Sequence, residues 1–99
     1  LLWAHELTHV WQWQNRRLTG YTPWKAALES WRRADPYFYE IVPGRGFLSY
    51  GYEQQAAMVE DYVCLSLFAP RDPRRARLRA VIAPVLPIER FEAVSGLRR

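Results

Sequence analysis

The stretch His5-Glu6-Leu7-Thr8-His9 has the HExxH spacing, with two histidines four residues apart. At about 3.6 residues per turn, the two imidazoles lie on one face of a helix and can reach the same metal ion. Glu6 then lies beside the metal, where its carboxylate can take a proton from a water whose pKa zinc lowers towards about 7. The spacing therefore predicts a zinc site with His5 and His9 as ligands and Glu6 as catalytic base.

The helix that carries this motif is expected to run from Leu1 to about Leu18 and to end at Gly20. With about 100° between successive residues, its side chains separate into an apolar side, expected to face the core, and a polar side that includes the motif. The apolar side holds Trp3, Leu7, Val10, Trp11 and Leu18, and the other side holds His5, Glu6, His9, Gln12, Trp13 and Arg16.

Proline and glycine divide the middle of the chain. Thr22-Pro23 is typical of a helix start, and the helix that follows is expected to run to about Arg33 and to end before Asp35-Pro36. The aromatic stretch from Pro36 to Tyr52 predicts a loose hairpin or an irregular loop. This loop could form a wall for substrate or a packed lid without substrate contact.

Three more helical segments are expected in the second half. Residues Tyr52 to Ala69 form a nearly all-round apolar helix that ends at Pro70, and Asp72-Pro73 begins another that runs to about Ala83. A short helical turn from Ile88 to Val94 and a frayed end from Ser95 to Arg99 complete the chain. The pattern predicts a mainly α (α+β) fold in one domain over residues 1–99.

A catalytic zinc usually takes three protein ligands, so a carboxylate or Cys64 must join the two histidines. Glu53 is the preferred candidate, because it begins a buried helix where an unpaired carboxylate would be costly. Glu60, one heptad later on the same face, is the competitor. Asp61 could instead accept a hydrogen bond from a ligating histidine.

Composition limits the class of protein. Ninety-nine residues with 49% hydrophobic side chains can form one core, and no run of about 18 uncharged apolar residues predicts a membrane span. The chain begins at Leu1 inside the expected motif helix, so we expect a fragment of a longer soluble protein. The single cysteine excludes an intrachain disulfide, and a reducing cytoplasm is the simplest location, with export by a secretion system as the alternative.

The net charge of +4 comes from the C-terminal part of the chain. Residues 71–99 hold eight Arg against three acidic residues, which predicts a basic helical tail. We expect this tail to dock a protein partner. Nucleic acid is disfavoured as a partner, because no recognised nucleic-acid-binding module accompanies the charge.

Two segments together resemble a known family. His5-Glu6-Leu7-Thr8-His9-Val10-Trp11-Gln12 and Tyr52-Glu53-Gln54-Gln55-Ala56 are similar to segments of the gluzincin-type bacterial zinc metallopeptidase-like proteins of the Vgr-related group. The resemblance covers about residues 1–68. It implies that His5, His9 and Glu53 bind zinc, that Glu6 is the base, and that the reaction is hydrolysis of peptide bonds in a peptide or protein substrate.

The resemblance also implies a zincin-like helical core, whose substrate-lining sheet would lie upstream of Leu1. Many gluzincins carry Asp four residues after the ligand Glu, and Ala57 occupies that position here. The alternative function is a catalytically weak or inactive scaffold module associated with bacterial secretion or toxin machinery. A hydrolase would also need a donor for the oxyanion, for which the sequence offers Tyr37, Tyr39, Tyr50, Tyr52 and Arg45 without ranking them.

Overall fold

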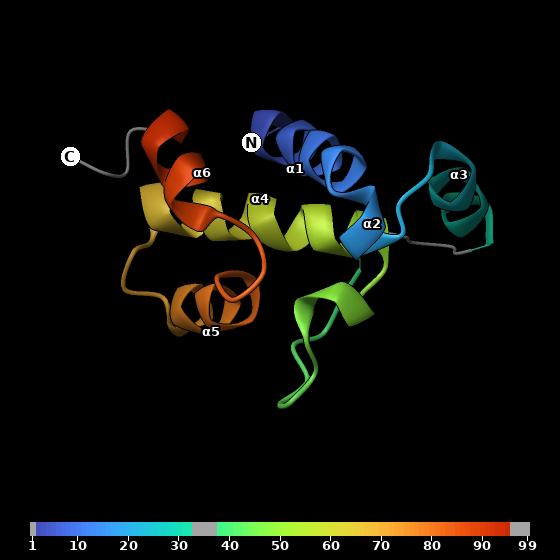
Figure 1. Ribbon diagram of the computed structural model, residues 1–99. Helices are drawn as coiled ribbons and strands as arrows, with labels where there is room; N and C mark the ends of the chain where they lie inside the picture. The colour runs from blue at the N-terminus through green and yellow to red at the C-terminus, as the bar shows by residue number, and fades with distance from the viewer. Residues whose placement is uncertain (1, 33–37, 96–99) are drawn as a thin grey trace.

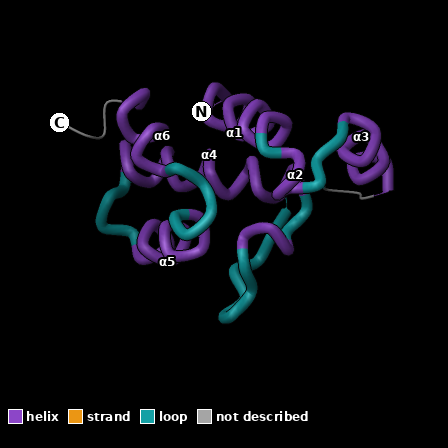
Figure 2. Tube along the Cα trace, viewed as in Figure 1, coloured by secondary structure: helices purple, strands orange, loops and turns teal. Residues whose placement is uncertain are grey.

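The helix α4 (Tyr52–Phe68) is the element against which the others pack. A computed structural model describes residues 2–32 and 38–95, and over these ranges the chain is helical and has no strand (Figures 1 and 2). The mainly helical fold class is therefore confirmed. The helices that pack most extensively on α4 are α1 (Leu2–Gln14), α3 (Pro23–Arg32), α5 (Pro73–Ile82) and α6 (Ile88–Ser95).

Local capping residues explain where several helices begin. The Thr22 hydroxyl accepts a hydrogen bond from the Lys25 backbone N–H at 3.1 Å, at the start of α3. At the start of α5, an Asp72 carboxylate oxygen accepts from the Arg74 N–H at 2.9 Å, and Pro73 follows as the first helical residue. Both predicted helix starts are confirmed, as is the short helix from Ile88.

The first helix is shorter than predicted. It ends at Gln14, because Asn15 leaves helical geometry and its side-chain amide donates to the Trp11 carbonyl at 2.9 Å. A separate turn, α2 (Arg16–Thr19), follows and ends at Gly20, whose φ of 70° is left-handed and whose N–H donates to the Arg16 carbonyl. Gly20 is therefore a helix stop as predicted, but it ends α2 rather than α1.

The predicted apolar stripe is only partly buried: Trp11 belongs to the core cluster, and Trp3 and Leu7 pack against it. Val10 and Leu18 are 48% and 57% exposed, whereas Thr8 and Gln12 are fully buried and His5 is 7% exposed. The prediction was wrong for the polar side, which packs on α4 because α4 supplies hydrogen-bond partners for it. Burying polar side chains is tolerated where each of them finds such a partner.

The loop before α4 is irregular, as one of the two expected alternatives proposed. Over its described part the only regular element is the single turn η1 (Phe47–Ser49), and no hairpin strands form there. The backbone N–H of Val42 donates to the Tyr50 hydroxyl at 3.1 Å, and the Arg45 guanidinium lies over the Tyr50 ring. The predicted break at Asp35-Pro36 lies outside the described residues.

The basic segment is part of the core rather than an appendage. Leu78 and Ile82 of α5 and Ile88 and Phe91 of α6 are each at most 3% exposed and belong to the main cluster of buried apolar residues. That cluster also includes Ala4, Trp11, Phe47, Tyr50, Met58, Val59, Tyr62, Val63 and Leu86. Within the described residues, no helix is both long enough and apolar enough to cross a bilayer. The predicted frayed end lies mostly outside the described part, although Ser95 still belongs to α6.

Candidate metal centre

Helices α1 and α4 bring three potential metal ligands together. The Nε2 atom of His5 lies 3.0 Å from Oε2 of Glu53, and the Nε2 atom of His9 lies 3.0 Å from Oε1 of the same carboxylate. The ligand atoms of the three residues all lie within 4.8 Å of one another. The HExxH spacing explains the pairing of the histidines, and the first turn of α4 places Glu53 opposite them.

The chemistry of this cluster suits zinc. Zinc bound tetrahedrally at about 2.0–2.2 Å requires ligand atoms about 3.3–3.6 Å apart, which small shifts of the side chains supply. Two imidazole nitrogens and one carboxylate also leave a fourth position for water or substrate, as in catalytic zinc sites. His5, His9 and Glu53 therefore fit the ion that the sequence predicts, although binding itself stays a prediction.

The charges within the cluster stabilise one another. Burial on its own would lower the pKa of His9, but its hydrogen bonds to Glu53 and Gln12 raise that pKa above the ordinary value. The hydrogen bond from His9 lowers the pKa of Glu53, against the opposing effect of burial. Each of the two side chains therefore favours the charged form of the other.

Each histidine has a second polar neighbour on its other ring nitrogen. The Nδ1 atom of His9 lies 2.8 Å from Oε1 of Gln12, a fully buried residue one turn further along α1. The Nδ1 atom of His5 lies 3.4 Å from Oε1 of Glu60, whose side chain is 30% exposed. Glu60 thus lies at the edge of the cluster, whereas Glu53 lies between the two histidines.

Glu6 lies beside the cluster and outside it. It is exposed and lines a cavity of about 430 Å³ together with His5, Ala57 and Glu60. A residue in this position can contact a molecule held next to the histidines without occupying a ligand position. The role of Glu6 as base stays a prediction.

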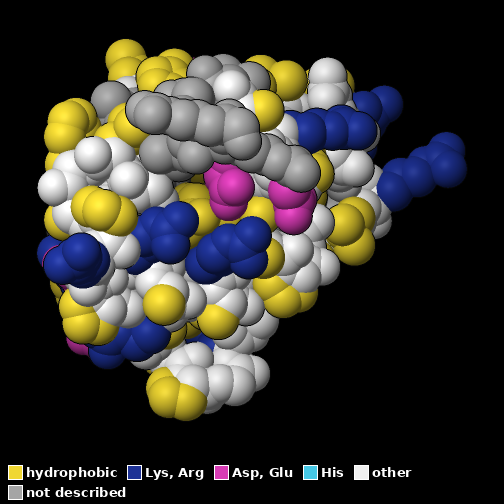
Figure 3. Space-filling model, turned by 90° about the vertical axis from the view of Figure 1, so that its left-hand side faces the viewer, with side chains coloured by type: hydrophobic (Ala, Val, Ile, Leu, Met, Phe, Trp, Pro, Cys, Tyr) yellow, Lys and Arg dark blue, Asp and Glu magenta, His cyan; other side chains and the backbone are white. Residues whose placement is uncertain are grey.

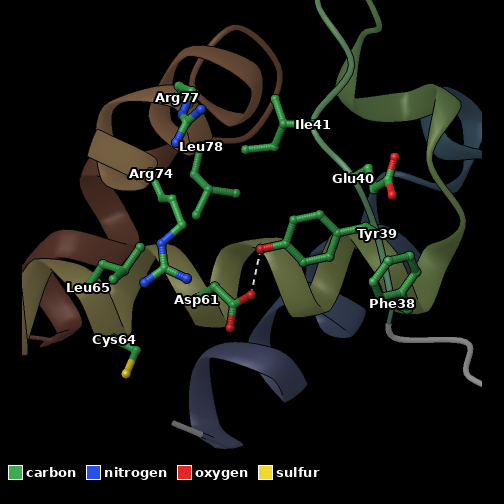
Figure 4. Close-up of a pocket in the computed structure, with 10 residues that line it drawn as sticks. All are labelled: Phe38, Tyr39, Glu40, Ile41, Asp61, Cys64, Leu65, Arg74, Arg77 and Leu78. Carbon is green, nitrogen blue, oxygen red and sulfur yellow. Dashed lines mark hydrogen bonds between the residues drawn. The ribbon is translucent and has the colours of Figure 1, made fainter. Parts of the chain in front are cut away.

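Asp61 does not take its predicted place beside a histidine. Its carboxylate accepts a hydrogen bond from the Tyr39 hydroxyl, which holds the loop against α4 (Figure 4). Asp61 lines the cavity beside His5 and also a larger one of about 700 Å³, so the two cavities adjoin. Cys64, the alternative ligand, lies in the wall of the larger cavity and outside the histidine cluster.

The loop before α4 lines this larger cavity, and contact of the loop with substrate stays a prediction. Phe38, Tyr39, Glu40 and Ile41 form one side of it, and residues of α4 and α5 form the other (Figure 4). The Gln54 side-chain amide donates to the Phe38 carbonyl at 2.7 Å, which ties the loop to the start of α4. The loop is thus both packed on the core and open to a cavity.

The oxyanion donors that the sequence offers contact other groups where the structure describes them. Tyr39 donates to Asp61, Arg45 donates to the Ser49 hydroxyl and carbonyl, and the Tyr52 hydroxyl donates to the Thr19 carbonyl at 3.3 Å. The Tyr50 ring is buried beneath Arg45, and Tyr37 lies outside the described residues.

Tyr21 is the residue that sequence analysis missed. Its ring centroid lies 6.0 Å from that of His9 and 5.1 Å from that of Tyr52, which it meets edge to face. Burial, followed by the negative charges of Glu53 and Glu6, raises the pKa of Tyr21, so its hydroxyl stays protonated. The available signal was its place directly after the stop at Gly20, where the chain turns back towards the motif helix.

Comparison with known proteins gives one partial similarity. No model of a protein family matches the chain, and no solved structure gives a significant match. The type VI secretion system spike protein VgrG2b of Pseudomonas aeruginosa is 39% identical over 67 residues, which cover 62% of this chain. The match spans only 6% of the length of VgrG2b. The chain is therefore similar to one segment of a bacterial Vgr protein, in agreement with the Vgr part of the resemblance.

Proposed function

We propose that the chain is a zinc-dependent peptidase domain in which His5, His9 and Glu53 hold the ion. The observation that carries the proposal is the convergence of these three side chains from two helices, with Glu6 outside the ligand set on the adjoining cavity. A structural zinc site would be closed by a fourth protein ligand, whereas this arrangement keeps one position open.

In the proposed reaction, Glu6 accepts a proton from the attacking water and passes it to the leaving amine. Bound zinc would polarise the scissile carbonyl and make the water more acidic. The Tyr21 hydroxyl, protonated and beside His9, would donate a hydrogen bond to the oxyanion that develops from the carbonyl. The adjoining cavities near Asp61 would receive the peptide on either side of the cleaved bond.

The test is the substitution Glu6→Gln, which keeps the side-chain shape but removes the proton acceptor. Zinc content should stay near one per chain, while hydrolysis of casein or a peptide library, followed by mass spectrometry, should fall by about 10²–10⁴-fold. Glu89→Gln, an exposed change on α6, is the matched control and should keep full activity. Equal cleavage by wild type and Glu6→Gln would show that Glu6 is not the base.

A scaffold function is the second candidate, and the basic residues of the chain favour it. Several Lys and Arg side chains lie on one face of the molecule (Figure 3), and Arg71, Arg74 and Arg77 are exposed. The similar VgrG2b is a spike protein of a type VI secretion system, and the proposed scaffold would dock a protein partner in machinery of that kind. Zinc in both the wild type and Glu6→Gln with cleavage by neither would select this function.

A further inference from the structure

Beside the cluster, two buried glutamines from different helices connect His9 to the backbone. Gln12 of α1 is fully buried and Gln55 of α4 is 1% exposed. The Gln55 Nε2 atom donates to the Tyr50 carbonyl at 2.8 Å, and the Gln55 Oε1 atom accepts from the Gln12 Nε2 atom at 3.0 Å. The second N–H of Gln12 donates to the Tyr52 carbonyl at 3.0 Å.

The backbone carbonyls of Tyr50 and Tyr52 determine the direction of these hydrogen bonds. A carbonyl can only accept, so Gln55 must turn its NH₂ group to Tyr50 and its oxygen to Gln12. Gln12 must then turn its NH₂ group to Gln55 and to the Tyr52 carbonyl. Reversing either amide would place oxygen against oxygen between buried groups, at the cost of an unsatisfied buried polar atom.

These hydrogen bonds also determine which ring nitrogen of His9 carries a hydrogen. With its NH₂ group committed, Gln12 has only its oxygen left for the His9 Nδ1 atom, 2.8 Å away. An oxygen accepts and cannot donate, so Nδ1 must carry the hydrogen. When a metal binds, the Nε2 atom, which faces Glu53, is then the nitrogen that would give up its hydrogen and offer its lone pair.

We propose that Gln55 and Gln12 form a relay that fixes His9 as its Nδ1–H tautomer and so directs Nε2 into the metal centre. Gln12 and Gln55 are positioning residues in this proposal, because neither touches the ion or the substrate. The proposal rests on the proposed function only for the identity of the ion. Many gluzincins carry an orienting Asp at the position of Ala57, whose side chain has no polar atom. In this chain, Gln12 provides an orienting contact for His9.

The direct test is nitrogen NMR of the histidine rings, with and without zinc. Long-range ¹H–¹⁵N spectra should show His9 protonated at Nδ1 and bound to zinc through Nε2. In metal-free protein, the His9 Nδ1–H should be protected from exchange with water, and Gln12→Met should abolish that protection. Zinc bound through Nδ1 of His9 would overturn the relay.

Zinc affinity measured by chelator competition provides the second readout. Gln12→Met, which is similar in volume but has no amide, should weaken zinc binding about 10–100-fold, as loss of such orienting partners typically does. Gln55→Met should give a smaller loss, because Gln12 keeps its hydrogen bond to the Tyr52 carbonyl. Gln55→Met also tests the relay if Gln12→Met does not fold.

Gln54→Met is the matched control. Gln54 is also buried and hydrogen-bonded, but to the Phe38 carbonyl and the Gly51 N–H rather than to the relay. It should lower thermal stability without changing zinc affinity. Equal affinities of folded Gln12→Met and wild type would overturn the proposal. A protein that shows the protected Nδ1–H but binds no zinc would overturn the proposed function and leave the relay standing.

Discussion

The two carboxylates near the histidines should differ strongly in their effect on zinc binding. Glu53 has a carboxylate oxygen 3.0 Å from each histidine Nε2 atom, and its side chain is 12% exposed. Glu60 has one contact with His5, at 3.4 Å, and a side chain that is 30% exposed. We therefore expect Glu53→Gln to remove a ligand and Glu60→Gln to remove only an outer contact.

The magnitudes follow from this geometry. Loss of an outer partner of a metal ligand typically costs about 10–100-fold in affinity. The Glu60 contact is longer than an ordinary N–H···O hydrogen bond, and water can replace it, so we expect the low end, about tenfold or about 1.4 kcal/mol. Glu53→Gln should exceed the top of that range, at more than about 100-fold or about 2.7 kcal/mol.

The assay is competition for zinc with a chromophoric chelator at fixed pH and ionic strength. Circular dichroism of each metal-free variant establishes that it is folded, and Glu89→Gln controls for the loss of one exposed negative charge. If folded Glu60→Gln loses more affinity than folded Glu53→Gln, the assignment of Glu53 as third ligand is wrong.

Two other substitutions test separate parts of the structure. Tyr21→Phe should leave zinc content unchanged and lower any peptide hydrolysis by about 10²–10³-fold, because it removes the hydroxyl donor beside His9; unchanged turnover would exclude Tyr21 as oxyanion donor. Gly20→Ala should destabilise the fold by about 1–2 kcal/mol in urea unfolding, because φ at Gly20 is 70°. Gly46→Ala, at φ of −76° with no heavy atom within 4 Å of the added Cβ, should be neutral or slightly stabilising, and an equal loss from both would refute the conformational explanation.

Features with local causes were predictable from the sequence. Asp72-Pro73 and Thr22-Pro23 begin helices through contacts within two or three residues, and Gly20 ends one through its own backbone angle. The approach of His5 and His9 depends only on helical periodicity. The meeting of Glu53 with these histidines needed a further premise, that a carboxylate at the start of a buried helix requires a partner.

Features that depend on packing between distant segments were not predictable in this way. A helical wheel sorts α1 by polarity, and it therefore assigned Gln12 to the side away from the core. Gln12 is buried because Gln55, far along the chain, offers it a complementary amide. Spacing alone could have suggested the contact with His9, because residues three apart are neighbours on a helix. Tyr21 depends on the direction of the chain after Gly20, which no periodic pattern specifies.

The polar side of α1 makes the candidate metal centre part of the core. Within the described residues, no buried side-chain nitrogen or oxygen lacks a hydrogen-bond partner, so the contacts of His5, His9 and Gln12 offset the cost of burying them. Substitutions at these positions must therefore change folding stability together with metal affinity. Bound metal itself stabilises the folded state, by an amount that grows with the logarithm of the ratio of free metal concentration to Kd. Glu6 is different because it is exposed, and its replacement by Gln leaves this buried network intact. A loss of turnover in Glu6→Gln can for that reason be attributed to proton transfer without a correction for unfolding.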